Sequence, residues 1–127
     1  MMKYTVFTYG TLMKKQRNHH YLKDCRYLCD ALLEGYGLFD TPYDYPAAVK
    51  MDGHTVYGEL YEADDKAKAM MDELEETGIL YDCVEVIVKT EYGDKKACFY
   101  EYLKPTERLR PYTQKGKWVC LKDRKQL

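Results

Sequence analysis

The chain has 127 residues, with 20 Lys and Arg against 21 Asp and Glu and a formal net charge of -1. This length suits one domain spanning residues 1–127, which can bury about two thirds of its unfolded surface without metal or disulfide staples. The balanced charge excludes the basic excess expected for nucleic-acid or membrane-surface binding, and no apolar run approaches the ~20 residues of a membrane span. We therefore expect a cytoplasmic protein that binds a small molecule or another protein.

Five cysteines are scattered along the chain, at Cys25, Cys29, Cys83, Cys98 and Cys120. Their odd number and the lack of a Cys-x-x-Cys pair argue against a disulfide framework or a zinc ribbon. Cys25 and Cys29 would share a face if their segment were helical, and together with His19 and His20 they make a thiol or metal site one hypothesis. Because free cysteine is more often a small buried apolar residue, we expect reduced thiols and no metal.

The chain begins with features of a strand and a turn. Residues 3–10 alternate polar or small with apolar side chains and stop at Gly10, which predicts a first strand. Asn18 can cap a short helix that runs to Leu22. A second strand is predicted over residues 31–39, broken by two glycines, and the turn-rich stretch after it contains two prolines that are incompatible with a central strand.

Two hairpins and one helix are predicted in the middle of the chain. An Asp52-Gly53 turn signal between residues 47–51 and 55–62 predicts the first hairpin. A helix is expected to begin at Asp64 or Asp65, because apolar residues follow at helical spacing until Gly78.

The second hairpin joins residues 81–90 to residues 96–102 through a bend at Gly93. From about residue 105 the tail is polar and basic, and its apolar residues able to anchor it are Trp118, Val119 and Leu121. Many strands with one helix favour an α+β domain built on a mostly antiparallel or barrel-like sheet.

The acids of the predicted helix are the main catalytic candidates, because the sequence has no Ser-His-Asp order, no phosphate-binding glycine loop and no helical zinc motif. At about 100° per residue, Glu75 lies roughly 90° from the centre of the apolar face, nearer than the other acids of the run. Partial burial and the helix dipole at this end would both raise its pKa toward the range of a general base. A solvated acidic face is the alternative interpretation of residues 72–76.

A second candidate site is the segment Tyr9-Gly10-Thr11-Leu12, where the first strand runs into a glycine turn. Successive backbone N–H groups in such a turn can form a concavity that binds an anion. An ordinary turn without a ligand is the alternative.

Several motifs follow one another in a specific order. They are Tyr-Gly-Thr-Leu within residues 6–13, Gly-Tyr-Gly-Leu at 35–38, Tyr-Pro-Ala at 45–47, Val-Tyr-Gly-Glu-Leu-Tyr at 56–61, and the acidic run at 71–76 followed by Tyr81-Asp82-Cys83. In this order they resemble the gamma-glutamylcyclotransferase-like superfamily, which includes the gamma-glutamylamine cyclotransferases. The resemblance covers roughly Tyr4 to Leu103, and the acidic run looks like the family pattern Leu-Asp-x-x-Glu-Gly followed by Tyr-x-Arg.

The resemblance implies a small mixed, mostly antiparallel β-barrel with flanking helices. It also implies an enzyme that cyclises a small gamma-glutamyl amide to 5-oxoproline and releases an amine or amino acid. Glu75 would be the general base, and the backbone of Tyr9, Gly10, Thr11 and Leu12 would bind the glutamyl moiety. No metal or other cofactor is implied, because the α-amino group of the substrate is the nucleophile.

Two positions depart from the family pattern. Glu76 stands where the family usually has glycine, and Cys83 stands where it often has arginine. The first adds a negative charge beside Glu75, and the second removes a cation from the acidic motif. These departures motivate an alternative, a non-catalytic module that binds a small ligand on the same barrel. The leaving group, the oligomeric state and the role of the tail stay open.

Overall fold

The structure, a computed structural model, describes residues 3–42, 45–107, 109–111 and 118. The elements of these segments are β1 (Lys3–Thr8), the 3-10 helix η1 (His19–Leu22), β2 (Arg26–Asp40), β3 (Pro46–Asp64), α1 (Asp65–Leu74), β4 (Tyr81–Thr90), β5 (Gly93–Tyr102) and β6 (Arg110–Pro111). Strands therefore dominate the described chain, with a single α-helix in the middle, as the sequence predicts.

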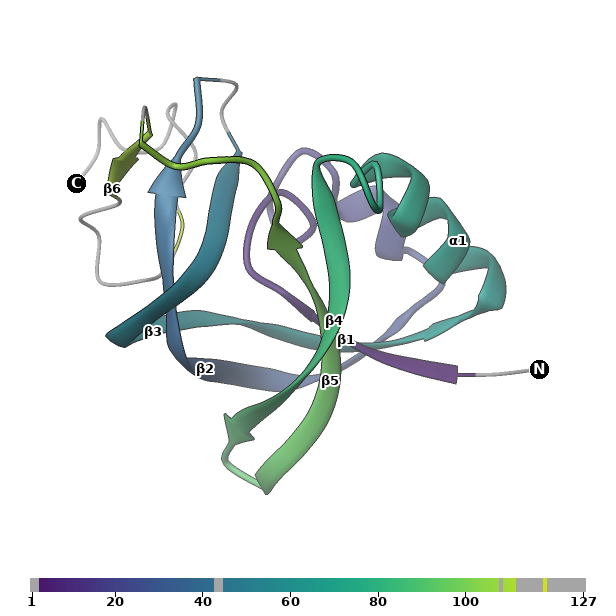
Figure 1. Cartoon of the computed structure of the whole chain (residues 1–127). Helices are drawn as coiled ribbons and strands as arrows, with labels where there is room; N and C mark the ends of the chain where they lie inside the picture. The colour runs from purple at the N-terminus through teal and green to yellow at the C-terminus, as the bar shows by residue number, and fades with distance from the viewer. Residues whose placement is uncertain (1–2, 43–44, 108, 112–117, 119–127) are drawn as a thin grey trace.

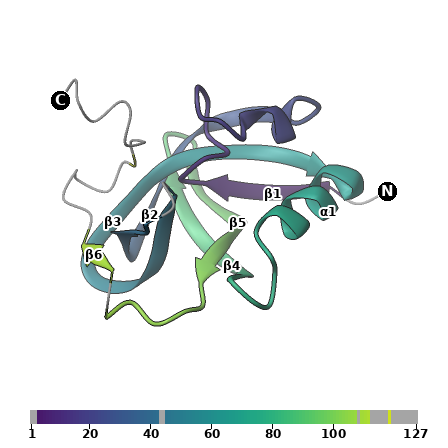
Figure 2. The same cartoon turned by 90° about the horizontal axis from the view of Figure 1, so that it is seen from above.

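The strands form one sheet in the order β3-β1-β5-β4-β2-β6, and β2 also pairs with β3. All these pairings are antiparallel except that of β1 with β5, where Val6 faces Cys98. Figures 1 and 2 show α1 and η1 beside the start of β1, whereas β6 lies at the other end of the molecule. The expected mostly antiparallel arrangement is therefore confirmed.

The pairing of β2 with β3 corrects one prediction. The Asp52-Gly53 signal does not form a hairpin, because the segments on both sides of it belong to β3 and both pair with β2. Residues 51–54 are instead accommodated as an irregularity opposite Gly35. Gly53 and Gly35 have φ angles of 81° and 84°, a conformation that glycine adopts easily and that serves a bulge as well as a turn.

The beginning of β2 corrects a second expectation. β2 starts at Arg26, before the predicted residue 31, so Cys29 lies in a strand and shares no helix face with Cys25. Cys29 is buried in one hydrophobic cluster, whereas Cys25 packs against another. The geometric premise of the thiol or metal site is therefore wrong. The described segments also contain no group of three or more His, Cys, Asp and Glu side chains that could hold a metal ion.

The helix and the second hairpin match the sequence predictions closely. Asp64 is the N-cap of α1, and its Oδ1 accepts a hydrogen bond of 2.8 Å from the amide of Ala67. Met71 is fully buried on the inner face of α1. β4 and β5 pair along their whole length, with Gly93 at the bend.

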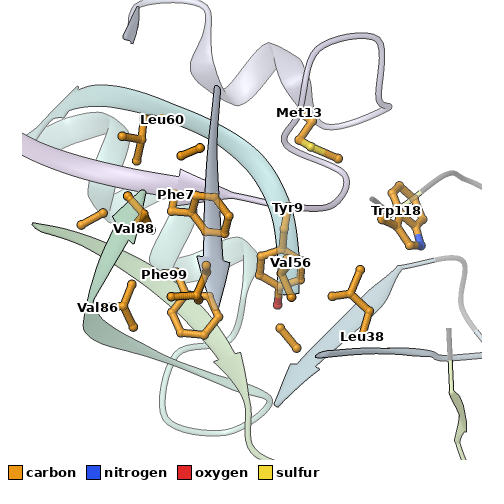
Figure 3. Packing of buried hydrophobic residues seen from close by; sticks show 14 of the residues in the cluster. Phe7, Tyr9, Met13, Leu38, Val56, Leu60, Val86, Val88, Phe99 and Trp118 are labelled. Atoms are coloured by element: carbon orange, nitrogen blue, oxygen red, sulfur yellow. The ribbon is translucent and has the colours of Figure 1, made fainter. Parts of the chain in front are cut away.

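Two hydrophobic clusters lie on opposite faces of β1, because Phe7 packs in the first and Val6 in the second. Figure 3 shows the first cluster, with Phe7 and Phe99 near its centre. Trp118 is 2% exposed in this cluster, as expected for an anchor of the tail; Val119 and Leu121 lie outside the described residues. The second cluster joins the sheet to α1 and η1 through Met71 and Leu22.

No helix within the described residues is both long enough and apolar enough to span a bilayer.

Candidate active site

One cleft brings together all five site residues expected from the sequence. It is lined by Tyr9, Gly10, Thr11, Leu12 and Glu75. Tyr45, Pro46, Tyr81 and Tyr100 complete most of its wall, and the cleft has a volume of about 30 Å³. The cleft therefore forms where the turn after β1 and the start of β3 meet the C-terminal end of α1.

The turn after β1 is fixed by its own hydrogen bonds. The amide of Met13 donates to the carbonyl oxygen of Gly10 at 3.1 Å, and the amide of Asn18 donates to that of Thr11 at 3.0 Å. The Asn18 side chain donates to Thr11 Oγ1 at 2.9 Å instead of capping η1. The backbone hydrogen bonds found among the described residues do not use the N–H groups of Gly10, Thr11 or Leu12. As far as the described residues go, these donors are available for a ligand.

Gly10 allows the turn to lie against the start of β3. A Cβ atom at position 10 would stand 2.8 Å from Cγ of Pro46, closer than side chains approach one another. Glycine at this position therefore lets the backbone of the turn form one side of a narrow cleft.

Glu75 is the residue that ends α1. Its amide donates to the carbonyl oxygen of Met71 at 2.9 Å, so the main chain is still held by the helix. The residue as a whole is partly exposed because it lines an open cleft, but protein atoms surround the carboxyl group. In the described part of the chain this carboxyl group has neither a hydrogen-bond donor nor a cationic partner.

Burial without a partner has a clear electrostatic effect on Glu75. Desolvation raises the pKa of its carboxyl group from 4.5 to about 7. The sequence predicted this direction, but the charge of Glu76 is not a cause of it. A carboxyl group of this pKa can both accept and donate a proton near neutral pH.

Two buried tyrosines form the wall beside Glu75. Tyr9 Oη donates to the carbonyl oxygen of Tyr100 at 2.6 Å, and Tyr81 Oη donates to that of Pro46 at 2.7 Å. Burial raises the pKa of both phenols, and the negative charge of Glu75 adds to each effect. Both hydroxyl groups therefore stay protonated and hold distant segments of the cleft together.

Behind the cleft, Asp72 ties α1 to β5 and also takes part in a partly buried ionic contact within α1. Lys68 Nζ lies 2.6 Å from Asp72 Oδ1, which also accepts a hydrogen bond of 2.7 Å from Tyr100 Oη. The Lys68 side chain is only 11% exposed. Asp72 of the acidic motif thus has a cationic partner from its own helix, although Cys83 stands where the family often has arginine.

Comparison with known proteins places the chain in a family. A family model described as gamma-glutamyl cyclotransferase, AIG2-like, matches residues 6–120. The chain is 33% identical over 114 residues to the gamma-glutamylcyclotransferase family protein YtfP of Escherichia coli (strain K12), covering 90% of this chain and 95% of that protein. The fold is thus that of the gamma-glutamylcyclotransferase-like class. The chain belongs to the gamma-glutamyl cyclotransferase, AIG2-like family, as the resemblance of its motifs suggested.

Two further likenesses extend this result. The chain is 32% identical over 103 residues to a Niallia circulans protein named gamma-L-glutamyl-butirosin B gamma-glutamyl cyclotransferase, covering 76% of this chain and 65% of that protein. The crystal structure of an AIG2-like protein from Mus musculus superposes with a TM-score of 0.82 at 21% sequence identity, covering 94% of this chain and 90% of the other. The second likeness shows the fold alone.

Proposed function

We propose that this protein is a gamma-glutamyl cyclotransferase that converts a gamma-glutamyl amide to 5-oxoproline and releases an amine or amino acid. The observation that carries the proposal is the carboxyl group of Glu75, which has no partner among the described residues and lines one cleft with the turn at residues 9–12. Among the same residues, the N–H groups of this turn at positions 10–12 make no backbone hydrogen bond. Membership of the family supports the reaction class. The name of the Niallia circulans relative describes the same kind of reaction on its own substrate.

Glu75 is the proposed general base. The α-amino nitrogen of the substrate forms a bond to its own γ-carbonyl carbon, and the bond from that carbon to the leaving nitrogen breaks. Glu75 accepts the proton from the attacking amine and returns it to the leaving nitrogen, so no proton is lost. A carboxyl group with a pKa of about 7 is suited to both transfers at neutral pH.

The turn at residues 9–12 is the proposed site for the negative charge of the reaction. The N–H groups of Gly10, Thr11 and Leu12, which make no backbone hydrogen bond within the described segments, can donate to the substrate carboxylate or to the oxyanion that develops on the γ-carbonyl oxygen. Because the nucleophile belongs to the substrate, holding it in a bent conformation removes much of the entropic barrier.

We also propose that the strands form the closed barrel that the resemblance to the family implies. β2 pairs with β3 as well as with β4. Because β3 is the first strand of the sheet order, this extra pairing supports a sheet that closes on itself as a barrel. A closed arrangement would hold the turn after β1 at a constant distance from β4 and β5.

Release of 5-oxoproline from a panel of gamma-glutamyl amines, dipeptides and glutathione tests the proposal. We expect turnover of at least one compound by the wild-type protein and a loss of at least about 100-fold in Glu75→Gln. Glu73→Gln, which changes an exposed acid of the same run, is the matched control and should keep its activity.

Two outcomes would contradict the proposal. Unchanged turnover in a folded Glu75→Gln variant would exclude Glu75 as the base. Thermal stabilisation of the wild-type protein by a gamma-glutamyl compound, without release of 5-oxoproline, would favour the non-catalytic binding module instead.

A further inference from the structure

The face of the β4–β5 hairpin that packs toward α1 carries two cysteines. Cys83 in β4 is opposite Tyr100 in β5, and Cys98 in β5 is opposite Glu85 in β4. Opposite residues of an antiparallel pair point to the same side, so Cys83 and Cys98 are diagonal neighbours on one face. Both are partly buried against the second hydrophobic cluster, and their thiol groups hydrogen-bond to one another.

The surroundings of the two sulfur atoms differ. The contact with Cys98 is the largest cause that lowers the pKa of the Cys83 thiol to about 7, and the nearby ammonium group of Lys68 adds to it against the opposing effects of burial and Asp72. The same contact and burial raise the pKa of Cys98. The pKa of Cys83 is thus lowered while that of its neighbour Cys98 is raised, which suits an attacking and a resolving cysteine.

Cys25 offers an internal comparison within the described residues. It is also partly buried and packs against the same cluster. Burial raises its pKa, and the charges of Asp64 and Asp24 raise it further. It has none of the features that would keep a thiolate at neutral pH.

We propose that Cys83 and Cys98 are a redox-active pair in which the Cys83 thiolate reacts with a peroxide and Cys98 closes an intramolecular disulfide. In the first step the sulfur of Cys83 attacks hydrogen peroxide, which gives a sulfenic acid and, after protonation, one water molecule. In the second step the sulfur of Cys98 displaces the hydroxyl group, which forms the S–S bond and releases a second water molecule. Two thiols are thereby oxidised by two electrons, and the peroxide is reduced to water.

The disulfide would form directly behind the wall of the cleft. Tyr100 is opposite Cys83 and two positions from Cys98, and its side chain lines the cleft and contacts Asp72. The pair itself uses no residue of the proposed reaction with gamma-glutamyl amides. It can therefore be tested without any substrate, and its failure would leave the proposed function untouched.

Mass spectrometry of the full, folded chain tests the proposal. After exposure to a small excess of hydrogen peroxide, digestion with trypsin without reduction should join the peptides of residues 69–89 and 97–108, with the loss of two hydrogen atoms. In a separate experiment at pH 7, iodoacetamide should alkylate Cys83 at least about tenfold faster than Cys25, because the thiolate is the reactive form.

Single substitutions separate the two roles. Cys98→Ser keeps a hydroxyl group that can donate to Cys83, so the Cys83 sulfenic acid should form and be trapped by dimedone while the linked peptides disappear. Cys25→Ser should leave the linked peptides unchanged. Alkylation of Cys25 as fast as that of Cys83 would overturn the proposal, as would oxidation of Cys83 without a bond to Cys98.

Discussion

At the scale of single residues, the burial of the Glu75 carboxyl group lowers the stability of the folded protein when this group is ionised. Its pKa is about 7 in the folded protein against an ordinary value of 4.5. Between these two pH values the unfolded chain has lost the proton that the folded chain keeps, so the folded state binds more protons. The free energy of unfolding therefore falls as the pH rises through this range, by at most about 3 kcal/mol.

Replacement of Glu75 by glutamine should remove this cost. The amide cannot ionise, so we expect Glu75→Gln to be more stable than wild type at pH 8, by up to about 3 kcal/mol. At pH 5, where the folded carboxyl group is already protonated, the difference should be much smaller. Urea unfolding at both pH values measures it.

The matched control for this comparison is Glu73→Gln, which removes one exposed charge from the same acidic run. If the free energy of unfolding differs between wild type and Glu75→Gln by the same amount at pH 5 and at pH 8, the Glu75 carboxyl group is not desolvated. The effect would then be a general change in charge or packing.

At the scale of elements, the end of α1 shows the structural consequence of one departure from the family pattern, the glutamate at position 76. The amide of Glu76 donates to the carbonyl oxygen of Glu73 at 3.2 Å, and the amide of Thr77 donates to that of Asp72 at 3.1 Å. These two bonds form a Schellman motif, which requires a left-handed residue directly after the C-cap. Glu76 occupies that position with a φ of 48°. The glycine usual in the family suits this conformation better.

Glu76→Gly should therefore stabilise the protein. We expect a gain of about 1 kcal/mol relative to Glu76→Ala, because alanine removes the charge but keeps a Cβ atom in the left-handed conformation. Chemical unfolding of wild type and both variants at one pH measures the gain. If alanine stabilises as much as glycine, the charge of Glu76 rather than its backbone conformation is responsible.

The elements that the sequence predicts well are those with local signals. Asp64 and the apolar spacing after it define α1, and the bend at Gly93 defines the β4–β5 hairpin. The Asp52-Gly53 signal misleads because a positive φ serves both turns and bulges. The partner strand decides between them, and pairing with β2 on both sides of the signal is a non-local property.

At the scale of the whole molecule, the cleft could be predicted only in part. Glu75 and the turn at residues 9–12 follow from the helix periodicity, the glycine turn and the family motifs. The hydrogen bonds of the tyrosine wall do not follow from the sequence. Tyr9 donates to a residue 91 positions away, Tyr100, and Tyr81 donates to Pro46, 35 positions away. Nothing local in the sequence shows which of the 14 tyrosines make such long-range hydrogen bonds.

The pH dependence of kcat/KM for 5-oxoproline release is the measurement that tests Glu75 as the base most directly. With a substrate from the gamma-glutamyl panel, wild type should show a rate that rises with pH and levels off above an apparent pKa near 7, because only the ionised carboxylate accepts a proton. In Glu75→Gln the rate should fall at least about 100-fold and lose this rise. The same rise and a comparable rate in Glu75→Gln would show that another group is the base.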